Sequence, residues 1–181
     1  WWSHVGWILS DKYKDTDYAA IKDFAKYPEL RLLQRREGTP PFIYGIAAFV
    51  IGGLVGTGGG WSWNGAWAGL VVGFFWSTVL LWHATFLVNS AAHVFGRRRY
   101  ETTDTSRNSF LIALATGGEG WHNNHHHYQV SARQGFFWWE LDLTYYVLKM
   151  MSWVGIVKDL KVPPARVLRP DSEPERELVA A

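Results

Sequence analysis

The chain has 181 residues, enough for one domain with its own core, and its formal net charge of +2 gives no reason to expect a nucleic-acid partner. It contains 12 Trp, 10 Phe and 8 Tyr but no Cys. Disulfides and thiolate chemistry are therefore excluded, and a metal site must use His, carboxylate or amide side chains. Because the chain begins with Trp1 rather than Met, we expect a fragment of a longer protein.

Residues 1–37 form the first expected segment. From residue 10 onward the segment mixes acidic, basic and apolar side chains, and Pro28 interrupts it. This pattern predicts short helices outside the membrane, on its cytoplasmic side.

Residues 38–96 form a predicted transmembrane helical hairpin, because they include no Asp, Glu, Lys or Arg. Two apolar runs, 41–56 and 66–88, flank a Gly- and Trp-rich turn at 57–65. The first run is near the short limit for a spanning helix, and the second has the length that a tilted helix needs. Tryptophans at the turn are typical of a membrane–water interface. A buried helical hairpin of a soluble protein is the alternative.

The flanking charges predict an orientation for this hairpin. Arg35 and Arg36 precede it and Arg97–Arg99 follow it, whereas the turn carries no charge. Cytoplasmic loops are enriched in Lys and Arg, so both ends of the hairpin are expected in the cytoplasm and the turn on the opposite side.

Residues 97–161 are predicted to form a cytoplasmic region that begins with a polar connector and a helix near Asn108. The apolar stretch 136–157 includes Asp142 and Lys149, two turns apart on one helical face. It therefore predicts an amphipathic helix that lies on the membrane rather than a third span. Residues 162–181, rich in proline and charge, are expected to be a disordered tail.

A histidine cluster, in the sequence GEGWHNNHHHY, gives the strongest chemical signal. In a helix, His122, His125 and His126 share one face and His127 points away. Imidazoles at i, i+3 and i+4 converge on a metal ion, so the cluster predicts a metal site. A surface turn rich in histidine is the alternative.

The end of the second apolar run adds two candidate ligands. The sequence FLVNSAAHVFG places Asn89 and His93 at i and i+4, at the predicted cytoplasmic end of the span, on the same side as the cluster. A histidine bonded at a helix end is the alternative for His93. Glu119, three residues before His122, is either a hydrogen-bond partner for an imidazole or, as we favour, a charge at the helix start.

Several motifs together resemble the membrane fatty acyl desaturases. SHVGW, LQRR, LVNSAAHVFGRRRY, SRN and GEGWHNNHHHY occur here in that family's order, over residues 1–161. The chain is most similar to the stearoyl-CoA (Δ9) group, and HNNHHHY and ARQGFFWWE resemble its bacterial members. The expected fold is an all-α integral membrane protein, a transmembrane helical hairpin with a cytoplasmic helical cap that carries a histidine-box metal site.

The resemblance implies O2-dependent insertion of a cis double bond, at Δ9, into a long-chain acyl thioester. It implies a non-haem centre of two iron ions (Fe2+/Fe3+) and a small electron donor of the ferredoxin, rubredoxin or cytochrome b5 type. Its ligand positions fall on His93, His122, His125 and His126, and on Asn89 through a water. A bacterial inner membrane is the implied location.

The sequence departs from the family in two ways. Neither the HxxxxH nor the HxxHH motif of the family is present, so we expect a carboxy-terminal fragment that is inactive alone. Animal members have two basic residues that help to hold CoA. Here these positions are Asp11 and Lys12, so only one basic residue remains. The substrate is therefore acyl-CoA, another acyl thioester or an acyl lipid. Lys12 is a candidate head-group contact or a solvated lysine. Phe86, one turn before Asn89, is a candidate wall of the substrate tunnel or a plain packing residue.

Three other functions are alternatives to the desaturase. A related membrane histidine-box hydroxylase or alkane monooxygenase shares the iron chemistry. A non-enzymatic membrane metal-binding module would distribute polar groups through the spans, and a soluble His/Asn nuclease would need a basic face. The uncharged hairpin disfavours both of these.

Overall fold

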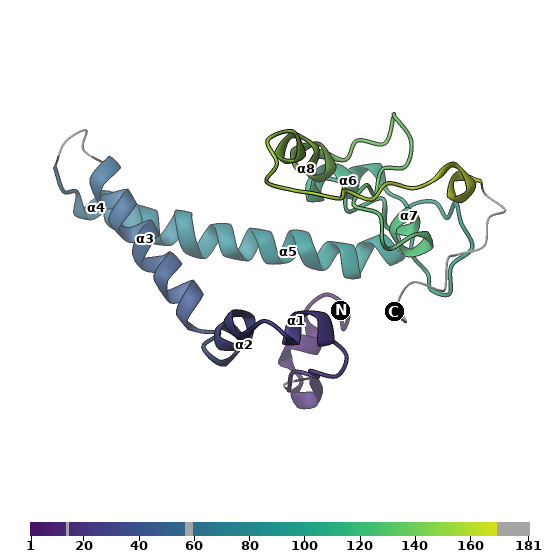
Figure 1. Ribbon diagram of the computed structural model, residues 1–181. Coiled ribbons are helices and arrows are strands. Elements are labelled where there is room, and N and C mark those ends of the chain that lie inside the picture. The colour runs from purple at the N-terminus through teal and green to yellow at the C-terminus, as the bar shows by residue number, and fades with distance from the viewer. Residues whose placement is uncertain (14, 57–59, 170–181) are drawn as a thin grey trace. The chain divides into compact units, whose positions relative to one another are not determined.

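The computed structural model describes residues 1–13, 15–56 and 60–169. These residues form helices joined by loops, with two isolated bridges (Arg97 with Asn108, and Asn108 with Trp121) and no strand within the described ranges, so the predicted all-α class is confirmed (Figure 1). The helices in chain order are η1 Gly6–Leu9, η2 Asp11–Tyr13, α1 Lys22–Ala25, α2 Pro28–Arg35, α3 Thr39–Val55, α4 Trp63–Ala68, η3 Gly69–Trp76, α5 Ser77–Asn89, η4 Ala91–His93, α6 Phe110–Thr116, α7 His122–His127, α8 Leu143–Trp153 and η5 Ala165–Leu168.

The chain divides into two compact units, and each is described by itself. Trp7–His83 form the hairpin unit, and Trp1–Gly6 with the chain from Ala84 onward form the histidine unit. The division falls within α5, and the segment boundaries predicted at residues 38, 97 and 162 stay predictions.

One helical stretch has the length and composition of a membrane span. Trp63–His93 is 31 residues long with a mean hydropathy of 1.7, and almost none of it is buried. α3 passes the same test only together with α2, from which it is bent by 77°. Within the described residues there is therefore one helix of membrane-span character, or two if the bent pair counts as one span. This agrees with the expectation that the first run is short.

Glycines set the distance at which α3 packs against α4 and η3 (Figure 1). A methyl group added to Gly52 would lie 2.8 Å from Cα of Gly69, and one added to Gly69 would lie 2.9 Å from Cα of Gly52. Cβ atoms do not approach backbone atoms so closely. Small residues at a helix crossing let two backbones approach, as is common between helices in membranes. The crossing therefore depends on backbone contact at these two positions.

The large apolar side chains of the two runs are mostly exposed. Phe42, Leu54, Trp63 and Leu81 each keep more than half of their surface accessible, from 57% for Leu54 to 69% for Phe42. An apolar surface of this extent is covered by lipid or by protein.

The centre of the histidine unit is polar instead. Its largest fully buried side chains are Tyr100, His127, Glu140, Asn123, Asn124 and Ser106. A small apolar cluster of Tyr100, Tyr128, Phe136 and Val167 lies beside them. Burial of so many polar groups is tolerated only when their hydrogen bonds are made.

The structure refines two expectations about this unit. The helix predicted in residues 136–157 begins only at Leu143, and Asp142 is its N-cap, with Oδ1 accepting a hydrogen bond of 2.9 Å from the Tyr145 N–H. Asp142 is buried, so it does not share a solvent-facing helical face with Lys149. The expected disordered tail begins at residue 162, but Ala165–Leu168 form η5, with Val167 buried. Residues 170–181 of that tail lie outside the described residues.

Candidate metal centre

Three imidazoles converge from two separate segments of the histidine unit. Nε2 of His122 lies 3.0 Å from Nε2 of His93 and 3.0 Å from Nε2 of His126. His122 and His126 come from α7, and His93 ends the short helix η4 after α5. Each residue offers one ligand atom, and these atoms all lie within 4.8 Å of one another. Such an arrangement suits a metal ion bound by nitrogen.

The helix that carries two of these imidazoles is six residues long and needs support from outside. Asn123 provides part of it, since its Oδ1 accepts hydrogen bonds from the Arg99 N–H (2.7 Å) and the Tyr100 N–H (2.8 Å). Its Nδ2 donates to the Tyr100 carbonyl at 3.0 Å. At the start of the helix, Trp121 Nε1 donates to the Leu141 carbonyl at 2.7 Å. The helix is thereby fixed on its side and at its start.

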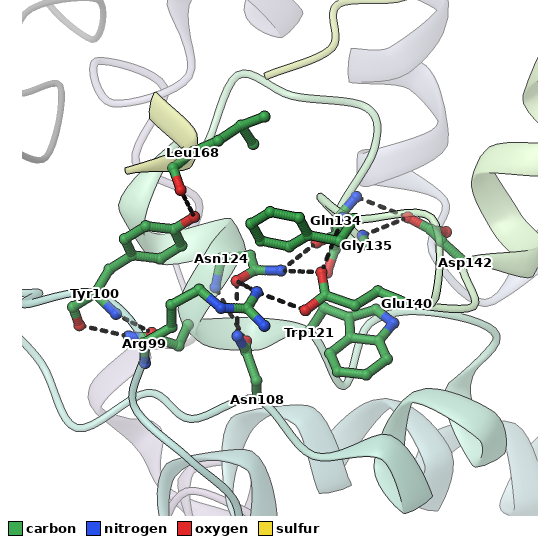
Figure 2. A network of polar contacts seen from close by, with 12 residues as sticks. Arg99, Tyr100, Asn108, Trp121, Asn124, Gln134, Gly135, Glu140, Asp142 and Leu168 are labelled. Carbon is green, nitrogen blue, oxygen red and sulfur yellow. Dashed lines mark hydrogen bonds and ion pairs between the residues drawn. The ribbon is translucent and has the colours of Figure 1, made fainter. Parts of the chain in front are cut away.

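Asn124 uses its whole hydrogen-bonding capacity in the same support (Figure 2). Its Oδ1 accepts from Asn108 Nδ2 at 2.6 Å and from Arg99 Nη1 at 3.1 Å. Its Nδ2 donates to the Gln134 carbonyl and to Glu140 Oε2, both at 2.9 Å. One side chain thus joins α7 to four other residues of the histidine unit.

A buried ion pair closes this network. Arg99 Nη1 lies 2.5 Å from Oε1 of Glu140, whose side chain is completely buried (Figure 2). The second carboxylate oxygen also accepts from the Phe137 N–H at 3.2 Å, and the Arg99 guanidinium lies over the Phe137 ring. Because the two charges lie in direct contact and Oε2 accepts two hydrogen bonds, the pair can be held away from water.

The outward nitrogens of two imidazoles also have partners. His126 Nδ1 lies 2.5 Å from Asp104 Oδ2, and His93 Nδ1 lies 3.3 Å from Thr105 Oγ1. Burial opposes ionisation of Asp104, but hydrogen bonds from Ser106 and the nearby His126 outweigh it and lower its pKa. A carboxylate that bonds the far nitrogen of an imidazole is a common arrangement around protein-bound metals.

Burial sets the protonation state of the central histidine. Together with the neighbouring imidazoles of His126 and His93, burial lowers the pKa of His122 to about 3. The ring is therefore neutral at physiological pH, and a neutral imidazole is the form that binds metals.

His125 faces the cluster without joining the three-nitrogen group. Its ring is roughly parallel to that of His122 at a centroid distance of 5.9 Å. Burial and His126 lower its pKa, and its buried Nδ1 has no hydrogen-bond partner among the described residues. A bound metal would satisfy such a nitrogen, so this observation fits a metal site that includes the predicted residue.

His127, the remaining histidine of the cluster, contacts residues of the fold outside the three-nitrogen group. His127 stacks on Tyr100 with a ring separation of 3.9 Å and an angle of 5°, and its Nε2 lies 3.2 Å from the Val167 carbonyl oxygen.

Asn89 is the predicted ligand position that acts through a water. It ends α5 and is exposed, and no hydrogen bond within the described chain joins it to the three imidazoles. The expected i, i+4 face with His93 does not form, because the chain tightens after α5 and the His93 N–H bonds the Ser90 carbonyl.

Three further candidates are described by their own contacts and exposure. Phe86 makes an edge contact with the ring of His4 at 5.7 Å, and Lys12 is exposed on η2 in the hairpin unit. Glu119 precedes α7, and no hydrogen bond in the described ranges links it to His122. Burial and Asp142 raise the pKa of Glu119.

Comparison with known proteins shows which family this chain is similar to. The fatty acid desaturase family model matches residues 1–152. An sn-1 stearoyl-lipid 9-desaturase of Synechocystis is 39% identical over 165 residues, which are 91% of this chain and 48% of that protein. One of the same description from Anabaena variabilis is 39% identical over 163 residues, 90% and 55% of the two chains. An acyl-CoA C20 Delta5-desaturase of Anemone leveillei is 36% identical over 166 residues, 90% and 49%.

The chain thus spans about half the length of the curated relatives it matches. The similarity runs through both the apolar hairpin and the segments that bring His93, His122 and His126 together. The resemblance predicted from the motifs is confirmed, and the chain belongs to the fatty acid desaturase family.

Proposed function

We propose that this chain acts in a membrane desaturase that inserts a cis double bond, at Δ9, into a long acyl chain with O2 as co-substrate. The observation that carries the proposal is the convergence of three imidazole Nε2 atoms, from the two segments that the family motifs single out. The names of the two cyanobacterial relatives support the Δ9 position.

The proposed cofactor is a pair of non-haem irons. His93, His122 and His126 would hold one ion, since their neutral nitrogens suit it, and His125 would bind at the same face. The two irons supply the activation of O2 that hydrogen removal from an unactivated methylene requires. A second ion needs further donors, and we propose that histidines of the HxxxxH and HxxHH motifs, absent from this sequence, provide them.

The proposed substrate is a long acyl chain on a lipid or a thioester. Two relatives are named for lipid-bound acyl groups and one for acyl-CoA. Lys12 remains the candidate head-group contact and Phe86 the candidate wall residue, with a ferredoxin, rubredoxin or cytochrome b5 type of protein as the electron donor.

We further propose that the hairpin spans the membrane with both ends in the cytoplasm, as in a bacterial inner membrane. The arginines at 35–36 and 97–99 support this orientation. The histidine segments would then lie at the cytoplasmic surface, with α8 along the membrane. Its exposed Val147, Met150 and Trp153 supply the apolar face.

A chimera tests the function without requiring activity from this chain alone. Residues 1–161 replace the matching segment of the Synechocystis relative, in a host that lacks Δ9 desaturation. Gas chromatography of the fatty acids is expected to show Δ9-unsaturated product, and none when the chimera carries His126→Ala. A hydroxylated product would favour the related hydroxylase, and a well-expressed chimera without either product would count against the proposal.

A further inference from the structure

We propose that the loop of residues 102–106 is a clamp that fixes the ring orientation and tautomer of His126 and His93, with Asp104 as its principal positioning residue. The proposal rests on the proposed metal site, because it explains how the two Nε2 atoms are kept free to bind an ion. The sequence of this loop, TTDTS, predicts by itself only a polar connector.

Asp104 is held in place by its own loop. Its Oδ1 accepts hydrogen bonds from the Ser106 N–H at 2.7 Å and from Thr102 Oγ1 at 3.2 Å. Ser106 is fully buried. Because these bonds occupy one carboxylate oxygen, Oδ2 is left to face His126 Nδ1, at 2.5 Å.

This contact determines where His126 carries its proton. An ionised carboxylate only accepts hydrogen bonds, so Nδ1 of a neutral His126 must carry the hydrogen. Nε2 then has a free lone pair, and it is this atom that lies 3.0 Å from His122 Nε2. A free imidazole in water favours the other tautomer, in which Nε2 carries the proton and so cannot bind a cation.

The same loop reaches the second segment. Thr105, the next residue, places Oγ1 3.3 Å from Nδ1 of His93, and a hydroxyl can accept from an imidazole N–H. Just after the loop, the Arg107 N–H donates to the Ala92 carbonyl at 2.8 Å, directly beside His93. One short loop thus contacts the outward nitrogens of two candidate ligands that lie 33 positions apart in the numbering, at His93 and His126.

The first test reads the tautomer in the metal-free, full 181-residue chain. With 15N-labelled histidine at about pH 8, long-range 1H–15N spectra are expected to show His126 with its proton on Nδ1. Asp104→Asn keeps the oxygen that caps Ser106 but can present an N–H to His126, so the proton is expected on Nε2. Asp104→Glu is expected to restore the wild-type tautomer.

The matched control is Glu101→Gln. Glu101 is an exposed carboxylate just outside the loop, paired with Arg98 at 3.7 Å, and it does not contact an imidazole among the described residues. This variant is expected to leave the tautomer of His126 unchanged.

The second test titrates the same chains with Co2+. Asp104→Asn is expected to weaken binding by about tenfold to a hundredfold, whereas Glu101→Gln binds like the wild type. A wild-type His126 that carries its proton on Nε2, or an Asp104→Asn chain that binds Co2+ as tightly as the wild type, would overturn the clamp. If the wild type fails to bind Co2+, the metal site is wrong, while the tautomer spectra still decide whether Asp104 sets the proton position.

Discussion

The hairpin unit and the histidine unit differ in which groups they expose and which they bury. In the hairpin unit, large apolar side chains such as Phe42 and Trp63 are exposed, and the contact between helices is made by glycine backbones at Gly52 and Gly69. In the histidine unit, the completely buried positions include Asn124 and Glu140. One unit presents its apolar groups to the outside, and the other encloses its polar groups.

The difference shows where each unit gets its specificity. Apolar side chains that face lipid tolerate exchange for one another, so the hairpin depends chiefly on close backbone approach at a few glycines. Buried polar groups tolerate little, because removal of one partner leaves the other unsatisfied and desolvated. The histidine unit should therefore be sensitive to single changes far from any metal ligand.

The largest effect is expected for Glu140→Ala. The Arg99 guanidinium and Asn124 Nδ2 would lose their buried partner, so unfolding of the histidine unit should be easier by about 3 kcal/mol. Thermal unfolding in detergent measures this loss. The control is Glu101→Ala, which breaks the exposed pair with Arg98 and should leave the unfolding temperature unchanged. Equal behaviour of the two variants would contradict the claim that buried polar contacts stabilise the histidine unit.

In the hairpin unit, Gly69→Ala should cost about 2 kcal/mol, because the new methyl group would overlap the backbone of α3. Gly73→Ala is the matched control one turn along, since a methyl group there meets only Ala48 Cβ at an ordinary 3.7 Å. Thermal stability of the two variants in lipid nanodiscs compares them. If Gly73→Ala proved the more damaging, the proposed glycine crossing would be wrong.

The smallest effect at neutral pH is expected for Tyr100→Phe, which removes a long hydrogen bond of 3.3 Å to the Leu168 carbonyl. Burial raises the pKa of Tyr100 from 10.0 to about 12. The folded state therefore holds the proton more tightly than the unfolded state, and stability falls as the pH rises from 10.0 to about 12. Chemical unfolding across this range should show a steeper loss for the wild type than for Tyr100→Phe, and parallel curves would refute the assignment.

The features that the sequence predicts well are those with a local signature. The absence of charge from 38 to 96 is a property of one continuous stretch, and the spacing of His122 and His126 follows from helical geometry alone. Both depend on neighbours within a few residues. Local pattern is therefore enough to predict an apolar hairpin and a histidine face.

Such local patterns do not predict side-chain contacts with residues from distant loops. Glu119 is close to His122 in sequence, but Gly117 and Gly118 have positive φ angles of 72° and 132°, and they turn the chain before α7 begins. The carboxylate that pairs with the His126 imidazole is instead that of Asp104, in a connector without periodicity. Glu140 shows the same limit, since an acidic residue next to an apolar helix suggests a solvent-facing charge and not a buried ion pair.

We propose that His93, His122 and His126 bind one metal ion through Nε2. X-ray absorption of the Co2+-loaded 181-residue chain tests it directly. We expect an inner shell with three imidazole nitrogens at about 2.0–2.1 Å, lost in His122→Ala but kept in His127→Ala. An inner shell of oxygen alone, or one that His122→Ala leaves unchanged, would contradict it.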